Sequence, residues 1–132
     1  GRGYCHWLDK KSELVDWVES CSQAFGYEVD LNAISQLMDK SDVYVLSSYA
    51  GGRISGTAIG FRTGNTFGIH QLGVLPEFRG QGIAKNLMKA LLLKAKELKC
   101  SNISLQASEA GLPLYKNLGF EPLGTLTSLR RT

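Results

Sequence analysis

The hydrophobic period of the chain changes twice, and this change limits its possible folds more than any other feature. Apolar residues recur at helical spacing over 14–25, in a segment that Gly26 would close. They recur again over 31–38, in a second short helix that Asp30 would cap and that would end near Ser41. From 43 to 74 the chain is β-prone and is interrupted by turns that contain glycine. Helical spacing returns over 83–98. The pattern therefore predicts helices, then an antiparallel meander, then a long helix.

The remaining segments complete the predicted fold. Short strands are expected at 4–8 and 103–105, on either side of these central elements. The meander divides into strands at 43–46, 53–62 and 66–74, and a last helix is expected at about 109–117, followed by extended chain from Phe120. Strands that alternate with helices indicate a mixed sheet covered on both faces, so the fold class is α/β or α+β.

The length and composition are those of an ordinary globular domain. The 132 residues suffice for one compact domain, expected to span 1–132. The 43% of hydrophobic and 20% of charged residues exclude a disordered, collagen-like or coiled-coil protein. The longest apolar runs, such as 90–93, fall far short of the roughly 20 residues of a membrane span, so no membrane partner is expected. No signal peptide is expected, and three cysteines without a C-x-x-C pair favour the reducing cytoplasm as the location.

The charge is only mildly basic. The formal net charge of +3 is far below that of typical nucleic-acid-binding proteins, so no nucleic-acid partner is expected. The alternative, a nucleic-acid-binding domain, would depend on a lysine-rich face on or beside the long helix. Such a face more often simply contacts solvent. The lysines concerned are Lys85, Lys89, Lys94, Lys96 and Lys99.

A glycine-rich turn joins a strand to the long helix within 72–84. Free N–H groups in the first turn of a helix, with the positive end of its dipole, form a site for a phosphate, and Gly80 and Gly82 would let that phosphate approach the main chain. A dinucleotide-binding fingerprint does not fit because its third glycine would fall on Lys85, and a Walker phosphate loop does not fit because Gly-Lys-Ser/Thr is absent. From this pattern alone, a flexible loop is the alternative.

Two ordered motifs narrow the interpretation. Arg79, Gly82 and Ala84 form the pattern Arg/Gln-x-x-Gly-x-Gly/Ala, after an approach of the form V-x-P-E-x-R-G. Further along, residues 114–120 read L-Y-x-x-L-G-F. Over about 53–120 the chain thus resembles the GNAT superfamily of N-acetyltransferases, whereas the first two helices fit that family only in number and position.

The resemblance implies a mixed, mostly antiparallel central sheet flanked by helices, in which the strands at 69–74 and 102–107 splay apart. Acetyl-CoA is the implied cofactor, and it would enter this wedge. Main-chain groups of 72–74 would pair with its pantetheine arm as an added strand does, and amides of 80–85 would hold its diphosphate. The cofactor-binding residues implied in this way are Leu72, Gly73, Val74, Arg79, Gly80, Gln81, Gly82, Ile83, Ala84, Lys85 and Ser108.

Tyr115 stands where the family places the acid that protonates the departing thiolate. A phenol with an ordinary pKa of about 10 stays protonated at neutral pH. Outside the motif, a core tyrosine with a bonded hydroxyl would be the simpler interpretation. Ser108 stands where many relatives have Asn, so a cofactor contact and a role as N-cap of the last helix are both open.

A general base is needed because a protonated amine has no lone pair with which to attack. His70 is the candidate. Period-two alternation predicts that its side chain shares a strand face with Leu72 and Val74, and that Gln71 lies on the opposite face. Ordered water as the base, and a histidine with only a structural role, are the alternatives.

The sequence predicts no metal site, because the spacings of the histidines and cysteines match no ligand pattern. After Phe120 the chain comfortably supplies one strand, where the family usually has two. A missing, shortened or exchanged last strand would leave an open sheet edge, and a homodimer is one expected consequence.

These features predict an acetyl-CoA-dependent N-acetyltransferase that transfers an acetyl group directly to a primary amine of a small molecule or peptide. The alternative is a catalytically silent CoA-binding regulatory module that keeps the phosphate loop and lacks an amine pocket. The sequence does not identify the amine acceptor.

Overall fold

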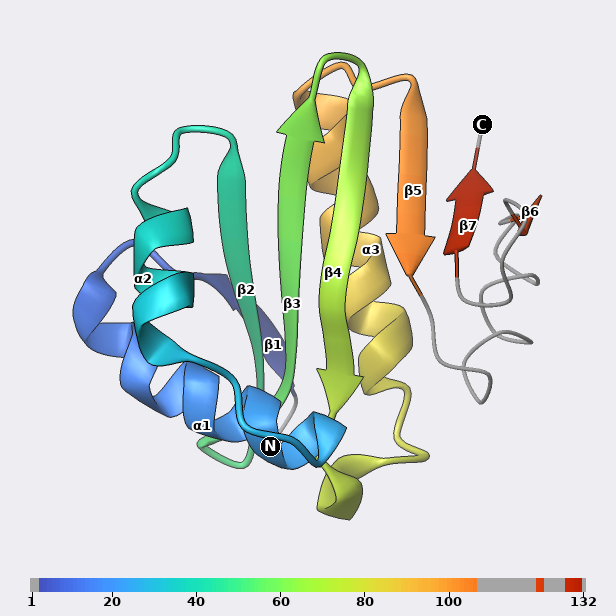
Figure 1. Cartoon of the computed structure of the whole chain (residues 1–132). Helices are drawn as coiled ribbons and strands as arrows, with labels where there is room; N and C mark the ends of the chain where they lie inside the picture. Colours follow the sequence, from blue (N-terminus) through green and yellow to red (C-terminus); the bar gives the residue numbers. More distant parts are fainter. Residues whose placement is uncertain (1–2, 107–120, 123–127, 132) are drawn as a thin grey trace.

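A computed structural model describes residues 3–106, 121–122 and 128–131 (Figure 1). Within these residues, seven strands form one sheet in the order β1-β2-β3-β4-β5-β7-β6. The strands are β1 (Tyr4–Trp7), β2 (Val43–Ala50), β3 (Arg53–Thr63), β4 (Thr66–Val74), β5 (Asn102–Gln106), β6 (Glu121–Pro122) and β7 (Ser128–Arg131). The helices are α1 (Leu14–Phe25), α2 (Leu31–Met38) and α3 (Ile83–Glu97), with 3-10 turns η1 (Lys11–Glu13) and η2 (Pro76–Phe78).

The strand direction is mixed, as predicted. Strands β1 to β4 are antiparallel neighbours, β4 and β5 are parallel, and β7 is antiparallel to both β5 and β6. The parallel pair is connected by α3, because strands that point the same way need a long crossover. The α+β sheet expected from the changes of hydrophobic period is confirmed.

Helices cover both faces of the sheet (Figure 1). On one face, α1 and α2 bury a cluster that includes Trp17, Cys21 and Ile59. On the other face, α3 buries a cluster that includes Leu91 and Phe67. Trp17 is fully buried, and its indole Nε1 donates a hydrogen bond to the main-chain oxygen of Leu46 at 2.8 Å. The sheet is therefore shared by two apolar layers.

The helix ends have local causes. Gly26, with a φ of 74°, ends α1, and its N–H bonds the Ser22 carbonyl at 2.9 Å. Asp30 begins α2, because its carboxylate accepts a hydrogen bond from the Asn32 N–H at 2.9 Å. Both ends agree with the sequence prediction. The longest helix, α3, has 15 residues, and no helix in the described part of the chain is long and apolar enough to cross a membrane.

The C-terminal segment differs from the expectation. Two short strands are present where one was expected: β7 pairs with β5, and β6 pairs with β7. Four residues of β7 suffice because sheet pairing uses main-chain groups, so an alternating apolar pattern is not needed to form it. The helix predicted at 109–117 lies outside the described residues.

Candidate active site

Among the described residues, strand β4 has a free edge along its second half. Strand β5 pairs with β4 only over Thr66 to Ile69. Beyond Ile69, this side of β4 has no strand partner among the residues that the structure describes, although Gly73 and Val74 still pair with β3 on the other side. The expected separation of the two strands thus begins at His70. It leaves a row of main-chain groups that an extended ligand would complete.

A β-bulge interrupts β4 within this free half. Gln71 has a φ of 54°, in the left-handed region. The register with β3 shifts here, because His70 pairs with Ile59 whereas Gly73 pairs with Thr57. One extra residue on β4 reverses the side-chain alternation from this point onward.

The bulge places His70 on the face opposite Leu72 and Val74, so the predicted shared face is wrong. Leu72 and Val74 pack against the cluster beneath α3. His70 lies on the side of α1 and α2, where its partner Ile59 belongs to the other cluster. A Cβ built on Gly68, which is on the same side, would lie 3.2 Å from Nε2 of His70. Strict alternation failed because it assumes a regular strand.

Two side chains that the sequence analysis did not identify support the bulge. The hydroxyl of the fully buried Thr57 donates to the main-chain oxygen of Gln71 at 3.0 Å. The hydroxyl of Tyr27 donates to Oε1 of Gln71, also at 3.0 Å. The partners are 14 and 44 residues apart, so no local motif signals either contact. Together they connect the bulge to β3 and to the loop after α1.

The turn after β4 presents free N–H groups at the start of α3. Gly80 and Gly82 have φ values of 81° and 78°, and no atom lies within 4 Å of a Cβ built on either. Glycine is therefore required by backbone conformation and not by crowding. The N–H groups of residues 80–85 donate to no main-chain carbonyl among the described residues. This is the donor cluster, at the positive end of a helix dipole, that suits a phosphate group.

The predicted phosphate-site residues differ in exposure. The side chain of Ile83 is buried in the core, that of Ala84 is half-buried, and Gly80, Gln81, Gly82 and Lys85 are exposed. Ile83 and Ala84 therefore offer only their main-chain N–H groups, as a backbone site requires.

Arg79 holds the turn against two other elements. Its guanidinium donates to the Val74 carbonyl at 3.1 Å through Nε, and to the Ala24 carbonyl at 3.0 Å through Nη2. Ala24 is in the last turn of α1, where the negative end of the helix dipole favours a cation. The described contacts of this side chain position the glycine turn relative to β4 and α1.

His70 has an exposed side chain beside the unpaired half of β4. It lies at the first position of β4 beyond the pairing with β5. Desolvation lowers the pKa of its imidazole below the ordinary value of 6.5. The ring is consequently neutral at neutral pH and carries a free lone pair. The other side chains predicted to act in chemistry or cofactor binding, Tyr115 and Ser108, lie outside the described residues.

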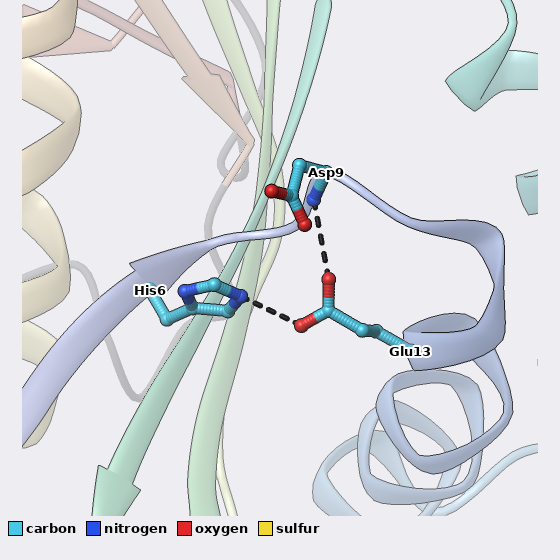
Figure 2. A group of neighbouring side chains, drawn as sticks. All are labelled: His6, Asp9 and Glu13. Atoms are coloured by element: carbon cyan, nitrogen blue, oxygen red, sulfur yellow. Dashed lines mark hydrogen bonds and ion pairs between the residues drawn. The ribbon is translucent and has the colours of Figure 1, made fainter.

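Three potential metal ligands gather near the start of α1 (Figure 2). Ligand atoms of His6, Asp9 and Glu13 all lie within 4.8 Å of one another, a juxtaposition that the spacing analysis did not find. The Glu13 carboxylate already bonds Nε2 of His6 at 2.6 Å and the N–H groups of Asp9 and Lys10 at 3.3 and 3.2 Å. Desolvation opposes its ionisation, but these hydrogen bonds lower the pKa of Glu13 overall. These contacts explain the cluster without a metal ion, because the Glu13 side chain caps the start of η1.

Comparison with known proteins agrees with this geometry. The family model for the acetyltransferase (GNAT) domain matches residues 9–128. The fold is similar to that of the ribosomal-protein-S18-alanine N-acetyltransferase from Escherichia coli, with a TM-score of 0.79 and 15% identity over 98% of this chain and 90% of that one. It is also similar to the PaiA N-acetyltransferase from Thermoplasma acidophilum in complex with coenzyme A, with a TM-score of 0.78 and 15% identity over 98% and 99%. An acetyltransferase from Trypanosoma brucei is similar as well, with a TM-score of 0.77 and 22% identity over 94% of this chain and 96% of that one.

The structural likenesses show the fold, and the family match covers most of the chain. The chain belongs to the GNAT family of acetyltransferases. The family resemblance seen in the two sequence motifs is thereby confirmed.

Proposed function

We propose that this chain is an acetyl-CoA-dependent N-acetyltransferase that transfers the acetyl group directly to a primary amine. One observation carries the proposal: the free edge of β4 over 70–74 leads, through one turn, into the free N–H groups of 80–85. A ligand with an extended amide-containing arm and a diphosphate fits both features. The coenzyme A complex of the similar protein from Thermoplasma acidophilum supports this ligand.

His70 would act as the general base in this reaction. Acetyl-CoA supplies an activated acetyl group in its thioester. The neutral imidazole takes a proton from the acceptor amine, whose nitrogen forms the new C–N bond as the C–S bond breaks. A main-chain N–H on the free edge of β4 would stabilise the negative charge that develops on the carbonyl oxygen. The thiolate that leaves needs a proton, and the family motif assigns its donation to Tyr115.

Binding and turnover test the proposal separately. Calorimetry should detect binding of acetyl-CoA, and release of free thiol should be measurable with a panel of primary amines. Binding without thiol release from any amine would favour a silent CoA-binding module, and a folded protein that binds no CoA would contradict the whole proposal.

Gly82→Glu tests the location of the diphosphate. The substitution places bulk and negative charge beside the free N–H groups, so CoA affinity should fall by at least about tenfold. Gly64→Glu is the matched control, since Gly64 also has a positive φ of 58° in open space but lies in the turn between β3 and β4. Equal CoA affinities for the two variants would contradict the site.

A further inference from the structure

Acidic side chains are concentrated in one segment of this otherwise basic chain. Residues 13–39 contain six Asp or Glu and no Lys or Arg, whereas the rest of the chain contains fifteen Lys or Arg and six Asp or Glu. The segment forms α1, α2 and their connecting loop, which cover one face of the sheet (Figure 1). The charge is thus unevenly distributed over the fold.

A groove of about 730 Å³ lies between α1 and the start of α2. Its lining combines valine and leucine side chains with carboxylates. The residues that line it are Val15, Val18, Glu19, Ser22, Glu28, Val29, Asp30 and Leu31. Val15 and Leu31 are 56% and 40% exposed, which leaves adjoining apolar surface available to a ligand.

The carboxylates of the groove have no cationic partner in the part of the chain that the structure describes. No ion pair joins Glu19, Glu28 or Asp30 to a Lys, Arg or His in the described ranges. Elsewhere in the segment two of the three remaining carboxylates are paired, because Glu13 bonds His6 and Asp39 bonds Lys11. The groove is therefore an apolar surface with an uncompensated negative rim.

The groove adjoins the candidate active site through the loop after α1. Tyr27 of this loop bonds Gln71 at the β4 bulge, and Glu28, Val29 and Asp30 follow directly in the chain. A ligand held in the groove would thus be held on the side of the sheet that carries His70.

On the basis of the proposed function, we propose that this groove binds a basic peptide segment of the acceptor. Its Lys or Arg side chains would meet Glu19, Glu28 and Asp30, and an aliphatic side chain would cover Val15 and Leu31. A peptide supplies both the positive charges and the branched apolar groups, whereas a polyamine supplies only charges and methylenes. The acceptor is accordingly a protein or peptide with basic residues near the acetylated amine.

Fluorescence anisotropy with a labelled ten-residue peptide tests the groove. The peptide carries three lysines, one valine and one leucine separated by glycines, and a second peptide has glutamates in place of the lysines. The lysine peptide should bind, and the glutamate peptide should not. Glu19→Gln with Glu28→Gln should raise the Kd of the lysine peptide on the order of fivefold to tenfold. Val15→Ser should also weaken binding. Added salt should weaken binding more in the parent protein than in the double variant, which keeps only Asp30 of the three groove carboxylates.

Glu97→Gln is the matched control. Glu97 pairs with Lys94 within α3, which covers the opposite face of the sheet from the groove. The substitution should leave the Kd unchanged. Equal binding of the two peptides, an unchanged Kd in the double variant, or equally strong competition by spermidine would overturn the inference. A salt-sensitive dimer that the double variant abolishes would also overturn it, by assigning the groove to a second copy of the chain.

CoA calorimetry on the same variants separates this inference from the proposed function. The double variant should retain its CoA affinity, since neither glutamate belongs to the 80–85 turn. Normal CoA binding and turnover without peptide binding would contradict the groove alone. Peptide binding without CoA binding would contradict the enzymatic proposal alone.

Discussion

At the scale of single residues, Gln71 determines which side chains face the site. Its left-handed backbone inserts one extra residue into β4, so that Leu72 and Val74 lie on the side of α3 whereas His70 lies on the side of α1. Such a conformation costs a non-glycine residue about 1 to 3 kcal/mol. The Thr57 hydroxyl, bonded to the Gln71 carbonyl, and the Tyr27 hydroxyl, bonded to its side chain, offset part of this cost.

His70→Gln should lower kcat by about 100-fold if the imidazole is the base. In the parent protein, turnover should fall as the pH drops through the pKa of His70, which lies below 6.5. That acid limb of the pH–rate profile should be absent in the variant. An identical profile with little loss of kcat would assign proton removal to water.

The same group gives a pH dependence of stability. Because the pKa of His70 is lowered by folding, the unfolded chain takes up a proton near pH 6.5 and the folded chain only at lower pH. Stability is thus present above pH 6.5 and is lost as the pH falls. Denaturant titrations should show a smaller loss for His70→Gln than for the parent protein; equal losses would contradict the assignment.

Thr57→Val should destabilise the fold by about 1 to 3 kcal/mol, because it keeps the shape but removes the donor to the Gln71 carbonyl. Urea unfolding measures the effect. Thr63→Val, at the exposed end of β3, is the control and should change stability by less than about 0.5 kcal/mol. Equal effects would show that Thr57 does not support the bulge.

At the scale of secondary-structure elements, Arg79 connects the three parts of the candidate site. It links the end of β4 to the last turn of α1 and lies directly before the glycine turn that begins α3. Within the sequence motif, Arg79 therefore has a structural role: it positions the glycine turn relative to β4 and α1.

Arg79→Ala should lower stability by about 1 kcal/mol and weaken CoA binding severalfold, since the turn loses its attachment to two elements. Calorimetry and thermal unfolding measure the two effects. Arg62→Ala removes an exposed ion pair with Asp42 and should leave both the stability and the CoA affinity unchanged. CoA affinity that survives Arg79→Ala would limit this side chain to a role in folding.

The lysines of α3 are not equivalent, although the sequence groups them on one face. The ammonium of Lys94 lies 5.0 Å from the ring centre of Trp7 and 5.3 Å from that of Tyr44. Lys94→Ala should therefore destabilise the protein by about 1 kcal/mol, whereas the exposed Lys89→Ala should not. Chemical denaturation of both variants tests the difference, and matching midpoints would contradict it.

At the scale of the whole molecule, one sheet is shared by two apolar layers. Each tryptophan reports on one of them, because Trp7 packs against the layer of α3 and Trp17 belongs to that of α1 and α2. Since both layers depend on the same strands, they should unfold together.

Leu91→Ala should lower stability by about 2 to 5 kcal/mol, because Leu91 is fully buried beneath α3. In proteins that keep only Trp7 or only Trp17, it should shift both fluorescence transitions equally and in step with far-UV circular dichroism. Transitions at different denaturant concentrations would show that the two layers unfold independently.

The sequence predicted much of this fold, since helix and strand periods, glycine turns and the Asp30 cap are local signals. It also located the free N–H groups of 80–85, because a glycine turn between a strand and a helix leaves them unpaired wherever it occurs. It did not predict the face on which His70 lies, because nothing in residues 66–74 marks the bulge.

What the sequence determined by itself is therefore the order of the elements from β1 to β5, the glycine turn and the family. The tertiary structure decided the partners of Gln71, the attachment of Arg79 to α1, and the collection of unpaired carboxylates around one groove. The physical reason is range: periodicity, caps and turns act over a few neighbouring residues, whereas hydrogen bonds and charges act across space between segments whose separation along the chain carries no signal.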